Sequence, residues 1–297
     1  MTHLAPIPHV RPGAWPEALG AGRFAAAIRR DTSDGCQVAL LGLADDAGVR
    51  LNGGRPGAAH GPTALRAALA RYGAADPASG PLPCVFDAGD VVAAGSLDET
   101  HARVTEATRA LLDRGLLPVA VGGGHDLTFP FVRAVAARWP GIAGLYFDAH
   151  LDVRDAPGSG MPFRRLIDDC GVRSLDLLGF RPLVNTAAHL AWFAEHGGTL
   201  RGDDEAVRLP EGPALFASVD LDVLDAAHAP GVSAPNPAGL TVRALEPWVR
   251  RCGEDARVRC FDVMELCPPH DEGGRTARVA AHLVLAFLAG YARRGAP

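Results

Sequence analysis

The chain alternates short aliphatic runs with longer stretches in which apolar residues recur at helical spacing. This alternation is typical of a parallel β-sheet whose strands are connected by covering helices, so it predicts an α/β fold. The expected strands are residues 37–43, 85–87, 117–121, 143–148, 174–179, 214–220 and 259–264. The expected helices are residues 62–72, 97–114, 127–138, 240–251 and 276–292. Their number suits one doubly wound layered sandwich.

The domain organisation is expected to be simple, because no Ser/Gly-rich linker, composition break or internal repeat divides the 297 residues. The hydrophobic fraction of 48% is enough for a substantial core, so residues 36–297 are expected to form a single domain. The proline-rich residues 1–35 are expected to form an N-terminal arm. Residues 153–169 directly follow an expected strand, which is where ligand-binding loops lie in open α/β sheets.

The overall charge and the cysteine pattern argue against several classes of function. The formal net charge is −5 and no long Lys/Arg run occurs, so nucleic acid is not an expected partner. The six cysteines form no CxxC pair and are expected to be reduced thiols. The start of the chain lacks a basic segment followed by an apolar one, and no apolar stretch reaches membrane-spanning length. We therefore expect a cytoplasmic protein that makes no membrane contact.

One strand-ending motif places three metal-capable side chains at alternate positions. The apolar run that starts at Leu145 ends in Asp148, His150 and Asp152. A period of two puts all three side chains on one face of an extended chain. Fully extended, the outer two would be about 13 Å apart at about 3.3 Å per residue, which is too far for one ion. Either the chain bends after the strand or two ions share the motif.

Two further apolar runs end in the same kinds of side chain. Asp220 and Asp222 follow the run that begins at Phe216, and they again alternate. His125 follows the three glycines 122–124, which let the backbone turn tightly beside a bulky or charged group. Taken singly, an Asp-x-Asp pair is more often a helix cap or a turn, and a His after Gly is usually structural.

Together, the three motifs place two imidazoles and four carboxylates at the carboxyl ends of expected parallel strands. Four aspartates gathered without cations would repel one another and raise their own pKa values. Oxygen and imidazole ligands without a thiolate favour two Mn²⁺ ions, with Zn²⁺, Co²⁺ or Fe²⁺ as alternatives. Paired ions about 3.5–4 Å apart can lower the pKa of a bridging water and so supply hydroxide near neutral pH. The predicted reaction class is metal-assisted hydrolysis.

Several segments resemble the arginase/agmatinase/formimidoylglutamase (ureohydrolase) superfamily. Its three signature motifs are similar to GGGHDLTFP, DAHLD and SVDLDVLDAAHAPGVSAP in this chain. Its early glycine-rich segment and its late strand are similar to LNGGRPGAAHGPTALRAAL and FDVMEL. The resemblance implies a three-layer α/β/α sandwich with a mainly parallel central sheet, a homo-oligomer, and hydrolysis of a C–N bond in a linear amidine by a metal-bridging hydroxide.

The same resemblance implies roles for individual residues. The ligands of a two-manganese site would be His125, Asp148, His150, Asp152, Asp220 and Asp222. Glu265 would be a catalytic residue whose carboxylate pairs with the cationic amidine or guanidine of the substrate. Asp152 is a second catalytic candidate, because the leaving group could be protonated through Asp152, His189, His228 or water.

The residues around the signature motifs resemble those of formimidoylglutamases. Ser159 replaces the His that arginases and many agmatinases use for proton transfer. Arg154 follows the DAHLD motif, and Asn185 precedes a Thr, as in that subfamily. With Glu265, these are the expected substrate contacts, and Arg154 is the candidate anchor because a substrate with two carboxylates needs cationic partners. The expected reaction converts N-formimino-L-glutamate to L-glutamate and formamide, in histidine degradation.

Two residues depart from the formimidoylglutamase pattern. Asp126 stands where that subfamily commonly has Glu, and Asp225 stands where it often has Pro. Asp126 is a candidate acceptor that orients the ring of His125. Because of these departures, an agmatinase, a guanidinobutyrase or an arginase-type enzyme that releases urea is the alternative with the same metal centre.

Two other classes of protein share some of these sequence features. A catalytically inactive metal-binding relative is the non-enzyme alternative, and the intact ligand set and Glu265 argue against it. The glycines 122–124 after a strand also resemble a nucleotide-binding Rossmann turn. Leu127, however, stands where the third glycine of that fingerprint is required.

Overall fold

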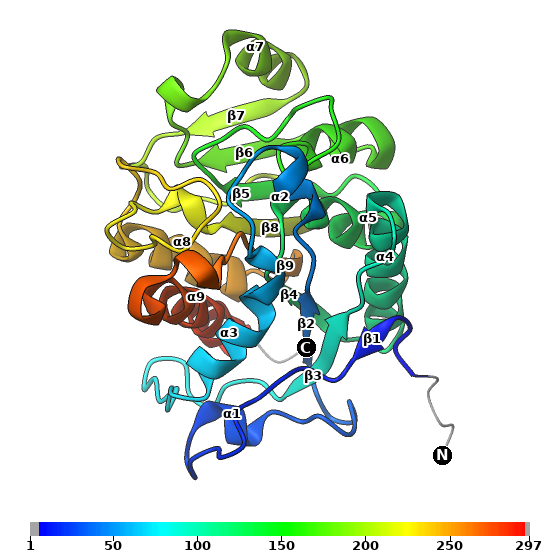
Figure 1. Cartoon of the computed structure of the whole chain (residues 1–297), viewed down its shortest axis with the longest axis vertical. Helices are drawn as coiled ribbons and strands as arrows, with labels where there is room; N and C mark the ends of the chain where they lie inside the picture. Colours follow the sequence, from blue (N-terminus) through cyan, green and yellow to red (C-terminus); the bar gives the residue numbers. More distant parts are fainter. Residues whose placement is uncertain (1–5, 295–297) are drawn as a thin grey trace.

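A computed structural model describes residues 6–294 of the chain. Within these residues one sheet of nine strands forms, in the order β1-β3-β2-β4-β9-β8-β5-β6-β7 (Figure 1). All neighbouring strands are parallel except β1 and β3, which are antiparallel. The strands are β1 (Val10–Arg11), β2 (Val38–Leu43), β3 (Val85–Val91), β4 (Leu117–Val121), β5 (Ala143–Phe147), β6 (Leu175–Leu178), β7 (Gly198–Arg201), β8 (Leu215–Asp220) and β9 (Val258–Met264).

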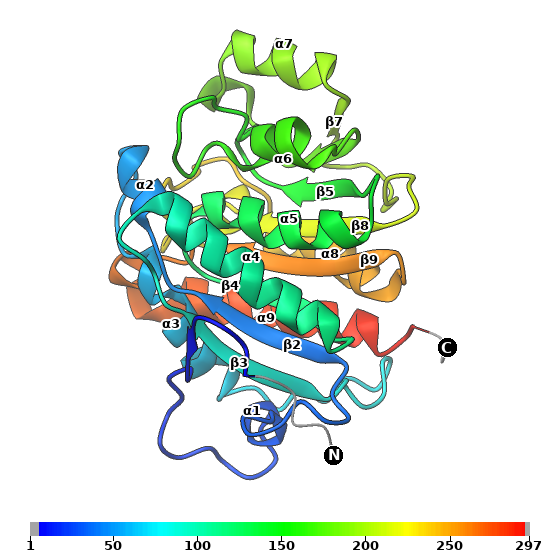
Figure 2. The same ribbon diagram turned by 90° about the vertical axis from the view of Figure 1, so that its right-hand side faces the viewer.

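Helices cover both faces of this sheet. The α-helices are α1 (Phe24–Ala27), α2 (Ala47–Leu51), α3 (Gly61–Leu69), α4 (Leu97–Asp113), α5 (Thr128–Arg138), α6 (Pro162–Cys170), α7 (Ala187–Glu195), α8 (Val242–Glu254) and α9 (Arg275–Tyr291). Helices α4, α5 and α6 pack on one face, and α3, α8 and α9 pack on the other (Figure 2). The predicted three-layer α/β/α sandwich is therefore confirmed. None of the described helices is both long and apolar enough to cross a membrane.

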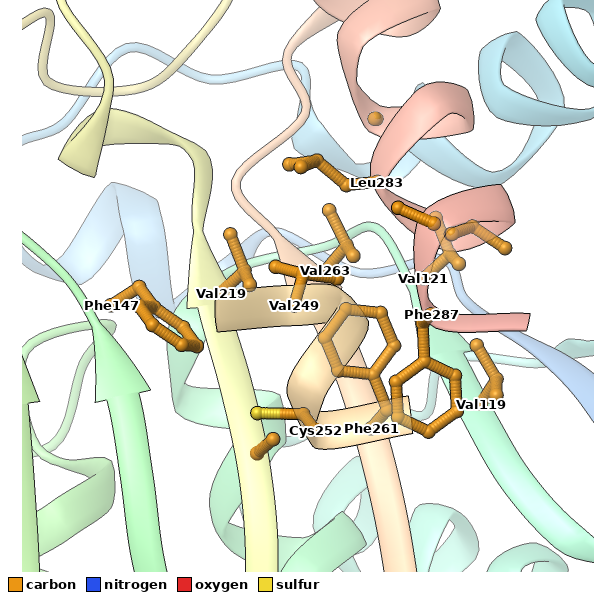
Figure 3. Close-up of a cluster of buried hydrophobic side chains, with 14 of the residues drawn as sticks. Val119, Val121, Phe147, Val219, Val249, Cys252, Phe261, Val263, Leu283 and Phe287 are labelled. Atoms are coloured by element: carbon orange, nitrogen blue, oxygen red, sulfur yellow. The ribbon is translucent and has the colours of Figure 1, made fainter. Parts of the chain in front are cut away.

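The central strands are apolar throughout because both of their faces are buried. Val219 of β8 and Val263 of β9 pack against Val249 of α8 and Phe287 of α9 (Figure 3). Neighbouring residues such as Phe216 point the other way, into the core beneath α4, α5 and α6. Period-two alternation thus divides each strand between two cores.

The predicted strands and helices are all present, but several elements were missed. Strand β3 continues past Asp87 to Val91 because its two acidic side chains, Asp87 and Asp90, both bind the buried guanidinium of Arg66. Residues 153–169, expected to be a ligand-binding segment, form a loop as far as Met161, and their second half forms most of α6. The short or polar elements β1, α1, α2, α7 and β7 had no clear periodic signal.

Part of the N-terminal segment is attached to the body of the molecule. Val10 pairs with Val91 at the edge of the sheet. The indole nitrogen of Trp15 donates a hydrogen bond of 2.5 Å to Asp87, and Ala25 is fully buried. Residues 6–35 therefore contribute to the edge of the sheet.

Candidate metal centre

The three predicted motifs meet at one edge of the sheet. His125 follows β4, Asp148 follows β5, and Asp220 ends β8. These strands are close neighbours in the order β4-β9-β8-β5, and they are all parallel. Since parallel strands end at the same edge, their terminal residues converge.

A first group of ligands surrounds the Nδ1 atom of His125. The nearest carboxylate oxygens belong to Asp152 at 2.9 Å, Asp148 at 3.2 Å and Asp220 at 3.3 Å. One ligand atom from each of the four residues lies within 4.8 Å of the others. This spacing allows all four to bind one divalent cation.

A second group lies beside the first and shares a residue with it. His150 Nδ1 lies 3.1 Å from Asp222 and 3.3 Å from Asp148. These three residues also offer atoms within 4.8 Å of one another. Because Asp148 belongs to both groups, its carboxylate can bridge two ions. All six predicted ligands are therefore brought together, and their grouping fits two ions rather than one.

The local backbone explains how each Asp-x-Asp motif aims its side chains. One oxygen of Asp148 accepts a hydrogen bond from the backbone N–H of His150 at 2.6 Å. In the same way, Asp220 accepts from the N–H of Asp222 at 2.8 Å. These short caps bend the chain after the strand. The bend brings alternate side chains closer together than an extended strand would.

Burial and missing partners support a cationic occupant. Asp148 is fully buried, and Asp222 is 2% exposed. Among the described residues, neither Asp148 Oδ2 nor Asp222 Oδ1 has a hydrogen-bond partner. Buried carboxylate oxygens are costly unless paired with a cation or a donor. The donor set of imidazole nitrogens and carboxylate oxygens fits Mn²⁺ and similar divalent ions.

The pKa shifts show how much negative charge is gathered here. Burial opposes protonation of His150, but the charge of Asp222 and the hydrogen bonds of Asp148 and Asp222 raise its pKa to about 12. Burial, reinforced by those two carboxylates, raises the pKa of Asp220 well above its usual value. The pKa of His125 is also well above its ordinary value, because its aspartate partners outweigh the effect of burial. Without metal, these side chains hold protons that offset the negative charge of the aspartates. Bound metal ions would offset the same charge.

Glu265 lies beside the ligands, directly after β9. Its Oε1 accepts a hydrogen bond of 2.7 Å from the backbone N–H of His125, while Oε2 has no partner among the described residues. Burial raises the pKa of Glu265 to about 8, against the opposing effects of Ser233 and His125. One carboxylate oxygen is thus held in place and the other is free to accept from a cation.

Two residues that were not predicted from the sequence, Ser218 and Asp262, hold the ring of His125. Its Nε2 lies 3.1 Å from the hydroxyl of Ser218, which in turn donates to Asp262 at 2.5 Å. These two hydrogen bonds place the ring proton of His125 on Nε2 and leave Nδ1 available for a metal. The prediction that Asp126 orients His125 is wrong, because the carboxylate of Asp126 lies 2.9 Å from His101 Nε2 instead.

A cavity of about 230 Å³ opens over the cluster. It is lined by Asn52, Gly53, Gly54, His125, His150, Asp152, Arg154, Ser159, Asp220, Asp222, Ser233, Ala234 and Glu265. Of the predicted substrate contacts, Arg154, Ser159 and Glu265 are in this lining and Asn185 is not. The larger hollows beside the N-terminal segment contain none of the cluster residues.

Asn185 instead supports the ligand loop from outside the cavity. Its carbonyl oxygen accepts from the N–H of Leu151 at 2.9 Å, and its amide nitrogen donates to Ala149 at 2.8 Å and to Arg181 at 2.9 Å. These bonds hold the backbone on either side of His150. The side-chain amide is thereby engaged in binding protein backbone.

The arginines near the cavity differ in their partners. Arg154 has no ion pair among the described residues, and it lines the cavity. Arg164 lies near two carboxylates, Asp155 at 3.5 Å and Asp168 at 3.6 Å, and its guanidinium stacks over Trp192. Of the described residues that line the cavity, only Arg154 therefore offers an uncompensated positive charge.

Comparisons with known proteins agree with this geometry. A model of the arginase family matches residues 36–290. The formimidoylglutamase of Ralstonia nicotianae is 40% identical over 87% of this chain and 86% of its own length. That of Halobacterium salinarum is 36% identical over 80% of this chain and 83% of its own.

Solved structures give the same result. The structure of Trypanosoma cruzi formiminoglutamase with two Mn²⁺ has a TM-score of 0.84 and 30% identity, covering 92% of this chain and 99% of that one. The formimidoylglutamase of Bacillus subtilis has a TM-score of 0.84 and 26% identity, with 92% of each chain covered.

Proposed function

Because the chain belongs to the arginase family, as a formimidoylglutamase-like hydrolase with a two-metal site, we propose that its substrate is N-formimino-L-glutamate. The products are L-glutamate and formamide. One observation carries this proposal: the cavity has an unpaired cation, Arg154, in the same lining as a cluster of carboxylates. A molecule with carboxylates at one end and an amidinium at the other matches that distribution of charge.

The proposed roles follow from position in the cavity. His125, Asp148, His150, Asp152, Asp220 and Asp222 would hold the two ions. Those ions, when bound, lower the pKa of water so that it can act as a nucleophile near neutral pH. The free oxygen of Glu265 would accept an N–H of the amidinium and orient its planar carbon. Arg154 and Ser159 would bind the carboxylates of the glutamate portion.

Asp152 has a second proposed role, in proton transfer. Adding water across the amidine and breaking its C–N bond requires a proton on the departing amine of glutamate. Of the candidates Asp152, His189 and His228, only Asp152 lines the cavity. We assign Asp152 to the transfer of that proton.

The experiment that tests the substrate is a panel of amidines and guanidines with Mn²⁺-loaded protein. The expected result is formamide and glutamate from formiminoglutamate, with little urea from agmatine, guanidinobutyrate or arginine. Urea release from a guanidine with formiminoglutamate left intact would contradict the proposal. In the same assay, Arg154→Ala should raise KM for formiminoglutamate, whereas Arg275→Ala should not, because Arg275 bonds the backbone of Ala227.

We also propose that residues 36–297 act as one catalytic domain of a cytoplasmic homo-oligomer. The apolar surface around Pro182–Val184 and α7 supports an assembly, since Leu183 is fully exposed and Leu190 is 37% exposed. Light scattering after gel filtration measures the mass. A mass of about one chain would contradict the oligomer.

A further inference from the structure

Two segments line the cavity beside the metal ligands and Glu265. One is the end of α2, with Asn52, Gly53 and Gly54, and the other is the loop between β5 and α6, with Arg154 and Ser159. They are about a hundred residues apart in sequence. Their contact is therefore a product of the tertiary structure, and it shapes the part of the cavity where Arg154 lies.

The side chain of Asn52 joins these two segments. Its Nδ2 donates a hydrogen bond to the hydroxyl of Ser159 at 3.0 Å. The backbone N–H groups of Ser159 and Asn52 both donate to the carbonyl of Gly48, at 3.0 Å and 3.1 Å. Ser159 is thus held to α2 by its side chain and by its backbone.

Two glycines of the loop make room for the Asn52 amide. A Cβ atom at Gly158 would lie 2.5 Å from Asn52 Oδ1. A Cβ atom at Gly160 would lie 2.9 Å from both Asn52 Nδ2 and Arg154 Cδ. The carbonyl of Gly160 also accepts from the N–H of Arg154 at 2.8 Å. The amide, the serine and the base of the arginine therefore form one packed unit.

The chemistry of the amide sets the direction of the serine hydroxyl. An amide nitrogen can only donate, so the oxygen of Ser159 must accept from Asn52. The hydroxyl hydrogen of Ser159 then points elsewhere and can donate to a ligand in the cavity. A carboxylate is the natural acceptor, because it is also the group that Arg154 would bind.

From this arrangement, and resting on the proposed function, we propose that Asn52 is a positioning residue that determines specificity. It holds Ser159 so that the serine hydroxyl donates to a substrate carboxylate beside Arg154. Asn52 acts through Ser159 and belongs to a segment that provides no metal ligand. The cavity would accordingly favour amidines that carry a carboxylate over those that do not.

The first test compares Asn52→Ala and Asn52→Asp in Mn²⁺-loaded protein. Asn52→Ala should raise KM for formiminoglutamate about tenfold, the effect of losing one hydrogen bond to a charged group, with kcat and bound manganese unchanged. Asn52→Asp should raise KM further, because the new carboxylate accepts the Ser159 hydrogen and repels the substrate. Leu51→Ala, the exposed neighbour, is the matched control and should leave KM unchanged. Unchanged KM in both Asn52 variants would overturn the inference.

The second test asks whether Asn52 acts through Ser159. Ser159→Ala alone and Asn52→Ala with Ser159→Ala should give the same KM, because the second change removes nothing further. On formamidine, which has no carboxylate, Asn52→Ala should leave kcat/KM unchanged. An additive loss in the double variant, or an equal loss on formamidine, would overturn the inference.

Assays of the wild-type protein show separately whether the proposed substrate is wrong. If wild type releases urea from guanidinobutyrate and leaves formiminoglutamate intact, the proposed substrate is wrong. The same pair of variants is then measured on guanidinobutyrate, which also carries a carboxylate. Coupling between Asn52 and Ser159 on that substrate would support the positioning role, and its absence would overturn it.

Discussion

At the scale of single residues, two acidic residues of the site have a backbone with positive φ, 48° for Asp152 and 66° for Glu265. Such a backbone costs a non-glycine residue on the order of 1–3 kcal/mol. Hydrogen bonds hold each one in place: Glu265 donates its N–H to Gly123 at 2.9 Å, and Asp152 accepts from Phe163 at 3.2 Å. The strained backbone places both residues in the lining of the cavity.

Asp222 tests the grouping of the ligands. Asp222→Asn should lower the manganese content from two ions toward one per chain and reduce activity, because the group of Asp148, His150 and Asp222 loses one of its two charges. Metal analysis after gel filtration measures the content. Asp225→Asn is the control, since Asp225 lies in the same segment but in neither group. Two tightly bound ions in Asp222→Asn would contradict its assignment as a ligand.

Glu265 is expected to act on substrate and not on metal. Glu265→Gln keeps the acceptor for the N–H of His125 but loses the charge that faces the amidinium. We expect kcat/KM to fall by at least about 100-fold, with manganese content unchanged. Steady-state kinetics and metal analysis on one preparation separate the two effects. Loss of metal in this variant would show that Glu265 has a structural role; Glu246→Gln, on the surface of α8, is the control.

At the scale of elements, strand β3 depends on a buried charge triad. Arg66 of α3 is 1% exposed, and it binds Asp87 through two hydrogen bonds of 2.9 Å and 2.8 Å and Asp90 through one of 2.6 Å. Trp15 donates to the same Asp87, and the absence of a side chain at Gly13 leaves room for the guanidinium. The triad thus connects α3, β3 and the N-terminal segment.

Removal of the cation should destabilise these elements together. Arg66→Ala leaves two buried carboxylates without a partner, and we expect the free energy of unfolding to fall by about 3–5 kcal/mol. Urea denaturation measures the change. Arg66→Lys, which keeps the charge but not the planar fork, should lose less stability. The exposed Arg71→Ala should change stability by less than about 0.5 kcal/mol; an equally small effect in Arg66→Ala would contradict this account.

At the scale of the whole molecule, the metal centre joins the ends of central strands, so its occupancy should affect global stability. Without metal, the folded chain holds extra protons, because the pKa values of His125 and His150 lie above their usual value and that of Asp220 is raised. The histidine contribution to stability is fully present below about pH 6.5, the unfolded pKa, and is lost progressively as pH rises above it. Buried Asp220 also costs stability once it ionises. Apo protein should therefore become less stable as pH rises.

Metal binding replaces those protons, so its stabilising effect should have the opposite pH dependence. The difference in Tm between Mn²⁺-loaded and chelator-treated protein should be larger at pH 8 than at pH 6. Thermal unfolding of the two samples in matched buffers measures it. A Tm difference that is constant, or that shrinks as pH rises, would show that the cluster does not lose protons when metal binds.

The fold class and the types of side chain at the metal centre follow from local patterns in the sequence. The apolar runs that end in Asp148 and Asp220, and the run that precedes His125, are local features. A parallel sheet necessarily gathers the ends of such strands at one edge. Strand β3 was predicted to end too early, because a sequence does not show that Arg66 binds both Asp87 and Asp90.

Which side chains reach the cavity depends on how distant segments pack together. Asn185 and Ser159 both looked like substrate contacts, yet one supports the loop backbone and the other lines the cavity. Ser218 and Asn52 lie in segments that resemble the family motifs, but their roles were not predicted, because those roles come from contacts with segments far away along the chain. Periodicity reports which face of an element is buried. It does not report which distant segment covers that face.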